Sequence, residues 1–146
     1  MRQIIIARKD LHMSSGKLAA QVAHAAMAFM SRSVRGQADK MALSNEYVVA
    51  LTFPKDVYED WFCGAFTKTV CEAKSLKQLL KAKTIAEELG LKEGQDFFLI
   101  MDNCLTELEP EIIDENGVGR TLTCIGFRPL DDETAWKISK KFQLYK

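Results

Sequence analysis

The sequence has little that would suit a membrane, fibrous or disulfide-rich protein. Its 146 residues include only 3 prolines and 8 glycines, and internal repeats and low-complexity tracts are absent. No apolar run approaches the roughly 20 residues that cross a bilayer, so no membrane partner is expected. The opening Met-Arg-Gln-Ile-Ile-Ile lacks the small-residue cleavage site of a signal peptide and predicts a strand instead. At this length we expect one domain, 1–146, with a core of its own.

Cysteine and histidine are also scarce. The four cysteines form no Cys-x-x-Cys pair and have no neighbouring histidines, so neither a disulfide framework nor a zinc site is expected. Scattered thiols of this kind favour the reducing cytoplasm. The two histidines, His12 and His24, lack the spacing with carboxylates that a metal site needs. The sequence therefore predicts neither a metal nor a cofactor.

An excess of charge of one sign is missing too, because 20 basic side chains balance 20 acidic ones. Net neutrality argues against a nucleic-acid partner. The distribution is uneven, however: residues 1–40 contain seven Lys and Arg against Asp10 and Asp39, whereas residues 41–146 are acidic overall. A local basic face can attract phosphates while the molecule stays neutral, unless acidic segments fold over it.

The most informative segment that is present is 13–29, which is rich in alanine and has no proline. It predicts a helix, with a serine near its start as the N-cap. Lys17, Gln21 and His24 fall on one stripe of this helix, and the remaining surface is apolar almost all round. Such a helix is expected to be buried. A buried stripe of Lys, Gln and His must then face partners or a cleft, as in an active site.

A short apolar run rich in β-branched residues, 3–7, precedes the helix and predicts a strand buried on both faces. A polar loop at 8–15 joins the two. Strand, loop and helix in this order form the first half of a βαβ unit. In open α/β sheets ligands gather outside the carboxyl ends of the strands, which is where this loop and Lys17 would lie.

The rest of the chain alternates between strand and helix patterns, which predicts an α/β fold with helices on both faces of the sheet. The run at 97–101 is wholly apolar and is therefore expected at the centre of the sheet. Trp136 is expected on the inner side of the last helix. Strands are expected at 47–53, 66–73, 97–101 and 120–127, helices at 56–62, 75–90 and from 131 or 132, and loops at 33–44 and 107–116.

Two residues far apart in the sequence are predicted to meet at one edge of this sheet. Lys17 begins the helix after the first strand, and Asp102 follows the strand at 97–101. If those strands are parallel, both side chains reach the same edge. The pair is either part of an active site or an ion pair that merely ties helix to sheet. Because buried ion pairs add little net stability, stability alone is a weak reason to keep one there.

Other catalytic motifs fit poorly. Ser15-Gly16-Lys17 is not a phosphate-binding loop, because Leu11 stands where the first glycine belongs and Leu18 replaces the residue that would hold magnesium. No serine lies in a Gly-x-Ser-x-Gly elbow, although a Ser–His–Asp triad stays open. A lone helical histidine such as His24 is more often a core residue, but its place on the stripe gives a site role equal weight.

The segment 5–26 closely resembles the opening motif of the archaeal and eukaryotic (type 2) peptidyl-tRNA hydrolases. The shared elements are Arg-x-Asp-Leu, Met, Gly-Lys, Ala-Ala-Gln and His-Ala, in that order. Looser matches continue along nearly the whole chain at Trp61-x-x-Gly64, Leu89-Gly90-Leu91, Leu99-Ile100-x-Asp102, Thr121 before Ile125-Gly126, and Phe142-x-Leu-Tyr.

This resemblance implies hydrolysis of the ester that joins a peptide to the 3′ end of tRNA, by a homodimeric enzyme. It also implies a three-layer α/β/α sandwich around a mixed, mostly parallel four-stranded sheet whose last strand is antiparallel, to which an insertion can add one extra strand. The residues carried over by position are Lys17, Gln21, Asp102 and Thr121 as catalytic residues, and His24 and Thr106 as supporting ones.

The resemblance also suggests how these residues act. Asp102 would orient or deprotonate a water, Lys17 would balance its charge, and Gln21 and Thr121 would donate hydrogen bonds to the substrate. The basic residues expected to contact tRNA phosphates are Arg8, Lys9 and Arg35.

The chain departs from the family pattern at one place. The family usually reads Asp-x-Gly-Arg-Thr where this chain has Cys104 and Leu105 between Asp102 and Thr106. This difference and the neutral charge favour an alternative, a non-catalytic tRNA- or protein-binding module on the same scaffold. Hydrolysis of another small ester or amide is a third possibility.

Overall fold

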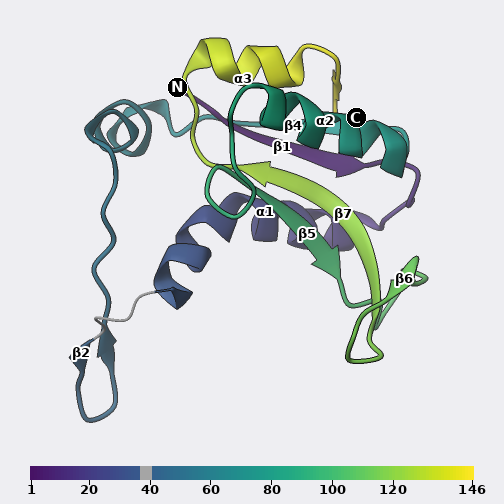
Figure 1. Cartoon of the computed structure of the whole chain (residues 1–146), viewed down its shortest axis with the longest axis horizontal. Coiled ribbons are helices and arrows are strands. Elements are labelled where there is room, and N and C mark those ends of the chain that lie inside the picture. The colour runs from purple at the N-terminus through teal and green to yellow at the C-terminus, as the bar shows by residue number, and fades with distance from the viewer. Residues whose placement is uncertain (37–40) are drawn as a thin grey trace.

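A mixed β-sheet forms the centre of the fold, and helices cover both of its faces (Figure 1). The computed structural model describes residues 1–36 and 41–146, so part of the loop expected at 33–44 lies outside the described residues. The main sheet has the strand order β5-β7-β1-β4-β8. Its strands are β1 (Gln3–Arg8), β4 (Lys68–Ala73), β5 (Phe97–Asp102), β7 (Gly119–Phe127) and β8 (Gln143–Leu144).

The strand directions agree with the predicted mixed sheet. β1 and β4 are parallel, and β7 is antiparallel to both β1 and β5, so β1, β4 and β5 all run the same way. β8 adds a short antiparallel strand beside β4. The loop expected at 107–116 contributes β6 (Ile112–Ile113), which pairs with β7 and supplies an extra strand.

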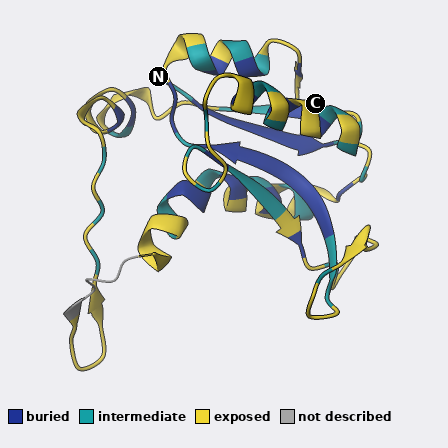
Figure 2. Cartoon of the chain, in the orientation of Figure 1, coloured by how far each residue is buried: buried dark blue, intermediate teal, exposed yellow. Residues whose placement is uncertain are grey.

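The two faces of β1 explain the three layers. Ile4 and Ile6 pack in a core with residues of α2 (Leu76–Glu88) and α3 (Asp132–Ser139), whereas Ile5 and Ala7 pack against α1 (Ser15–Arg35). Side chains alternate along a strand, so a wholly apolar strand needs such cover on both sides. Figure 2 shows β1 and most of β7 buried between the helical layers.

The first helix is less buried than the sequence predicts. Ser14 is its N-cap, accepting a hydrogen bond from the Lys17 backbone N–H, and the helix continues to Arg35. The sequence predicted that the helix would be covered nearly all round, but the side that faces away from the sheet is exposed. Only one side of the helix packs on the sheet, and alanines carry so little apolar surface that their exposure on the other side is tolerated. The exposed apolar residues are Ala19, Ala20, Ala23, Met27 and Val34.

The strand β5 lies at the edge of the sheet, so its predicted central position is wrong. After β4 the chain passes through α2 and enters β5, which lies on the other side of β1 from β4. β7 then lies between β1 and β5. Its apolar composition has another cause. Phe97 packs in the core beneath α2 and α3, and Ile100 packs on the α1 side, so both faces are apolar although one edge is open.

The predicted strand at 47–53 is also wrong for most of its length. Only β3 (Tyr47–Val48) forms, and it pairs with β2 (Met41–Ala42) in a hairpin that stands away from the main sheet (Figure 1). Tyr47 and Val48 are exposed, so the apolar pattern here does not mark a core strand. The short helix expected at 56–62 is the π-helix η1 (Val57–Ala65).

The prediction for Trp136 is wrong as well, since this side chain is 57% exposed. α3 has only 8 residues, and Ala135 and Ile138 take the inward positions. The Lys140 ammonium lies 4.4 Å from the centre of the Trp136 ring, so the indole is covered by a cation rather than by the core.

The contact between α1 and the sheet depends on Gly126 in β7. A Cβ at this position would lie 2.4 Å from the backbone oxygen of Ala25, so the helix can approach only because the side chain is absent. This close approach sets how near the first half of α1, and with it Lys17 and Gln21, comes to the sheet.

We therefore expect Gly126→Ala to push α1 away from β7 and to lower the free energy of unfolding by roughly 1–3 kcal/mol. Urea unfolding followed by circular dichroism measures this. Gly16→Ala is the matched control, because the added Cβ meets no atom within 4 Å and a helical alanine is favourable. Equal stability of the two variants would contradict the close-packing role of Gly126.

Candidate active site

A cavity of about 290 Å³ opens where α1 passes the carboxyl end of β5. Its walls come from the first half of α1, from the end of β5 and from the loop that follows. In open α/β sheets this end of the strands is where ligands bind. The lining residues are Lys17, Gln21, His24, Met101, Asp102, Asn103, Leu105 and Thr106.

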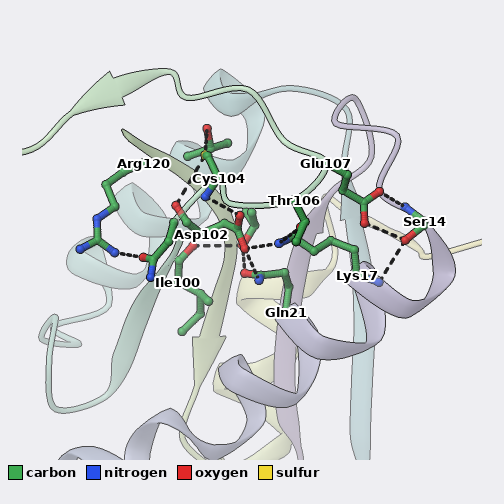
Figure 3. Close-up of polar contacts among 12 residues, drawn as sticks. Ser14, Lys17, Gln21, Ile100, Asp102, Cys104, Thr106, Glu107 and Arg120 are labelled. Carbon is green, nitrogen blue, oxygen red and sulfur yellow. Dashed lines mark hydrogen bonds and ion pairs between the residues drawn. The ribbon is translucent and has the colours of Figure 1, made fainter. Parts of the chain in front are cut away.

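The predicted meeting of Lys17 and Asp102 is confirmed. The Lys17 ammonium Nζ lies 2.6 Å from Asp102 Oδ2, and both side chains are largely shielded from solvent (Figure 3). Lys17 Nζ also donates a hydrogen bond of 3.2 Å to Thr106 Oγ1. An ion pair in such surroundings is weakly screened, but it also carries a desolvation penalty, so it is poor evidence of a purely stabilising role.

Two further donors fix the Asp102 carboxylate. Gln21 Nε2 donates to Oδ2 at 2.8 Å, and the Cys104 backbone N–H donates to Oδ1 at 2.8 Å (Figure 3). Asp102 is 7% exposed and Gln21 is 4% exposed. The carboxylate is therefore held from both sides by the helix and by the turn that follows β5.

The orientation of the Gln21 amide is set by Thr123, a residue that the sequence did not single out. Thr123 Oγ1 donates to Gln21 Oε1 at 2.6 Å, which turns the amide N–H₂ group towards Asp102. The pairing of β5 with β7 shifts register between Ile100 and Met101, so that Thr123 is an extra residue on β7. Such a bulge re-aims side chains, and here Thr123 and Cys124 both point towards α1.

Cys104 adopts the left-handed backbone conformation, with φ of 54°. Only glycine accepts this region without strain, and the related family pattern has glycine here. The Cys104 thiol lies 3.4 Å from Thr121 Oγ1 and 3.7 Å from the Asp102 carbonyl oxygen. The turn that presents the Cys104 N–H to Asp102 is thus formed despite the side chain.

Thr121 lies directly beside Asp102 in the register of β5 and β7, but its side chain is fully buried behind the cavity. Its hydroxyl donates to the Glu109 carbonyl oxygen at 2.7 Å and accepts from the Glu111 N–H at 3.1 Å. In this arrangement the hydroxyl holds the loop after β5 and does not face the cavity.

Arg8 is buried and fully engaged, contrary to the expectation that it would meet a phosphate. Its guanidinium forms paired hydrogen bonds with both Asp10 and Glu111, and Nη1 also donates to the Leu122 carbonyl oxygen at 3.1 Å. Burial lowers the pKa of Arg8, but the hydrogen bonds to the two carboxylates outweigh it and hold the pKa above its usual range. Arg8 thus anchors the loop that carries Glu111.

A second clamp joins this loop to the start of α1. Glu107 accepts hydrogen bonds from the Ser14 N–H at 3.0 Å and from the Ser14 hydroxyl at 2.7 Å (Figure 3). These two bonds lower the pKa of Glu107 below its usual value of 4.5. The negative charge sits at the N-terminus of the helix, where the helix dipole favours it.

Of the remaining predicted site residues, two line the cavity and two do not. His24 is exposed and lines it, as does Thr106. Lys9 is paired with Glu72 at 2.7 Å and donates to the backbone oxygen of Lys146, away from the cavity lining. Arg35 is exposed in the last turn of α1. All four cysteines are free thiols, and among the described residues no His, Cys, Asp and Glu gather into a group that could hold a metal.

Comparison with known proteins shows the family to which this chain belongs. The family model described as peptidyl-tRNA hydrolase PTH2 matches residues 1–145. The chain belongs to this family. A peptidyl-tRNA hydrolase of Methanopyrus kandleri is 33% identical over 132 residues, which cover 90% of this chain and 87% of that protein. A peptidyl-tRNA hydrolase of Thermoplasma acidophilum is 29% identical over 143 residues, which cover 98% and 97% of the two chains.

A third relative, a peptidyl-tRNA hydrolase of Thermococcus sibiricus, is 29% identical over 143 residues and is also matched almost end to end, over 96% of its length. The matches therefore cover most of the length of both this chain and these three relatives. No described helix has the length and apolar character required to span a bilayer.

The left-handed turn of this PTH2-family chain leads to a prediction at Cys104. We expect Cys104→Gly to keep or slightly raise stability, since glycine removes the backbone strain while the N–H to Asp102 is retained. Cys104→Val places a β-branched residue in the same conformation and is expected to lower stability by roughly 1–2 kcal/mol. Thermal melting and hydrolysis of N-acetyl-aminoacyl-tRNA measure both. A valine variant as stable and active as the glycine variant would show that the turn does not need this conformation.

Proposed function

We propose that the protein hydrolyses the ester bond of peptidyl-tRNA and so releases free tRNA for reuse in translation. The proposal is carried by one observation: in a member of the PTH2 family, Lys17, Gln21 and Asp102 form a single hydrogen-bonded cluster in the wall of a cavity. Family membership supplies the substrate class, and the cluster supplies groups suited to ester hydrolysis.

Asp102 is the proposed base. An ionised carboxylate has about four acceptor sites, and three are used by Lys17, Gln21 and the Cys104 N–H. The remaining site can accept a hydrogen bond from a water molecule. As that water attacks the ester carbonyl carbon, Asp102 takes its proton. The bond to the ribose oxygen then breaks, this oxygen takes a proton, and the products are a peptide acid and tRNA.

Lys17 is the proposed stabiliser of the negative charge that develops on the carbonyl oxygen. Of its three N–H donors, one meets Asp102 and one meets Thr106, so a third remains for the substrate. A fixed donor in a partly shielded site acts strongly on such a charge. Gln21 orients the carboxylate, while Thr121 and Thr123 are proposed to act as positioning residues behind it.

A non-catalytic binding module is not favoured. The change at Cys104 and Leu105 leaves the turn and the N–H to Asp102 in place, so the groups that the reaction needs are all present. The four free thiols and a substrate of translation support a cytoplasmic location, which we also propose.

We further propose that the protein is a homodimer, as its resemblance to the family implies. The exposed small apolar side chains on the outer face of α1 support this, because a helix face of this kind packs closely against a second copy. Met27, the largest of them, is 52% exposed in the single chain.

The catalytic proposal is tested with N-acetyl-aminoacyl-tRNA. We expect Asp102→Asn to reduce kcat/KM at least about 100-fold, because the amide keeps the shape of the carboxylate but cannot take the proton. Lys17→Ala is expected to lose turnover as well. Glu88→Gln, an exposed carboxylate on α2, is the matched control and should behave as the wild type. Circular dichroism and thermal melting show whether each variant is folded, and a folded Asp102→Asn protein with near-normal turnover would refute the assignment.

The dimer is tested by light scattering after size-exclusion chromatography. The wild type is expected at twice the chain mass, and Met27→Glu is expected to shift it towards the monomer because it places a charge in an apolar contact. Lys77→Glu on α2 changes charge on the opposite side of the sheet and should leave the mass unchanged. A monomeric wild type at micromolar concentration would overturn the proposal.

A further inference from the structure

The active-site cavity continues into a groove between α1 and the open edge of β5. A second cavity, of about 340 Å³, shares His24 and Met101 with the first and extends to Arg32 and Arg35. A third, of about 390 Å³, shares Arg32, Phe98 and Leu99 with the second and reaches Glu93. We name this run of cavities, from Lys17 to Arg35, the α1–β5 groove.

We propose that the α1–β5 groove binds the single-stranded 3′ end of tRNA, with Arg32 and Arg35 contacting its phosphates. This inference rests on the proposed function, because it assumes that the ester lies beside Lys17 and Asp102. The nucleotide chain then leaves the ester along the groove, and the peptide leaves on the other side, over the loop at 103–106.

The charges in the described residues favour a polyanion here. Four basic residues near the start of the chain are already paired with carboxylates, whereas Arg32 and Arg35 form no ion pair with a described residue. The carboxylates at the two ends of the groove, Asp102 and Glu93, are neutralised by Lys17 and Lys83 at 2.6 Å each. The four paired residues are Arg2, Arg8, Lys9 and Lys17.

The shape and the apolar wall fit a single strand. From Lys17 to Arg32 the helix rises by roughly 22 Å at about 1.5 Å per residue, which is long enough for several nucleotides. The opposite wall is β5, where Met101 is 36% exposed and Phe98 is partly exposed. Unpaired bases pack on such apolar and aromatic side chains, whereas bases in a duplex are stacked on one another and cannot.

The edge position of β5 is what opens the groove. A further strand beside β5 would cover this side of the sheet, but in the described chain the sheet ends at β5. Because α1 contacts both β5 and β7, the helix and the strand edge form two fixed walls. The site is therefore built from rigid elements and does not depend on a loop closing.

The test compares Arg32→Ala/Arg35→Ala with Lys77→Ala/Lys81→Ala, which removes the same charge from α2 on the opposite face of the sheet. With N-acetyl-aminoacyl-tRNA we expect the arginine variant to raise KM on the order of tenfold and to change kcat little, since it removes interactions with phosphate and no reacting group. The slope of log(kcat/KM) against log salt should flatten by about 0.7 for each phosphate that is no longer neutralised. The lysine variant should behave as the wild type.

A second measurement separates this inference from the proposed function. A short RNA ending in CCA, titrated into the full chain, should shift the amide NMR signals of Arg32, Arg35 and Met101, and a blunt RNA duplex should not. If the wild type hydrolyses the substrate but the arginine variant is unchanged, or the duplex binds equally well, the groove assignment is overturned and the function stands. If the wild type does not hydrolyse the substrate, the function fails, and the CCA-ended RNA still decides whether the groove binds single strands.

Discussion

The contact between Lys17 and Asp102 is the interaction on which the site depends. The two residues lie 85 positions apart in the sequence and meet only because β1 and β5 run in the same direction with β7 between them. The distance is set by the close approach of α1 to β7 at Gly126, where any side chain would meet the helix backbone. A lysine and an aspartate in such shielded surroundings are costly to leave unpaired, so the fold and the charge pair constrain each other.

Much of this arrangement follows from the sequence, but not all of it. The place of Lys17 at the start of a helix and of Asp102 after an apolar strand predicted their meeting on the condition that the first strand and the strand at 97–101 run in the same direction. The structure meets that condition. The edge position of β5 was not predictable, since an apolar run shows that both faces are covered and says nothing about its neighbours in the sheet. Thr123 was missed because its direction depends on a one-residue bulge, which leaves no periodic signal.

The charge distribution along the sequence predicted a basic region, but it did not show which basic side chains are free to bind a ligand. The basic excess of residues 1–40 predicted a phosphate-binding face, yet Arg8 is paired with its neighbour Asp10 and with the distant Glu111, and Lys9 is paired with the distant Glu72. The sequence cannot show the pairs with Glu111 and Glu72, because the fold brings these two residues to Arg8 and Lys9 from distant parts of the chain. A buried arginine held by two carboxylates orders the loop behind the cavity and is unsuited to exchange them for a mobile phosphate.

The departure from the family pattern after Asp102 affects two features: the backbone turn at position 104, whose N–H binds Asp102, and the side-chain charge at position 105. The backbone turn is kept, because Cys104 adopts the left-handed conformation and its N–H donates to the Asp102 carboxylate. Position 105 carries no positive charge, because it is occupied by Leu105, which is 82% exposed. A guanidinium nevertheless lies close by, since Arg120, paired with Asp114, donates to the side-chain oxygen of Asn103 in the cavity wall (Figure 3). Loss of an exposed cation weakens attraction for a substrate but leaves the alignment of Asp102 intact, so the change bears on binding rather than on the chemical step.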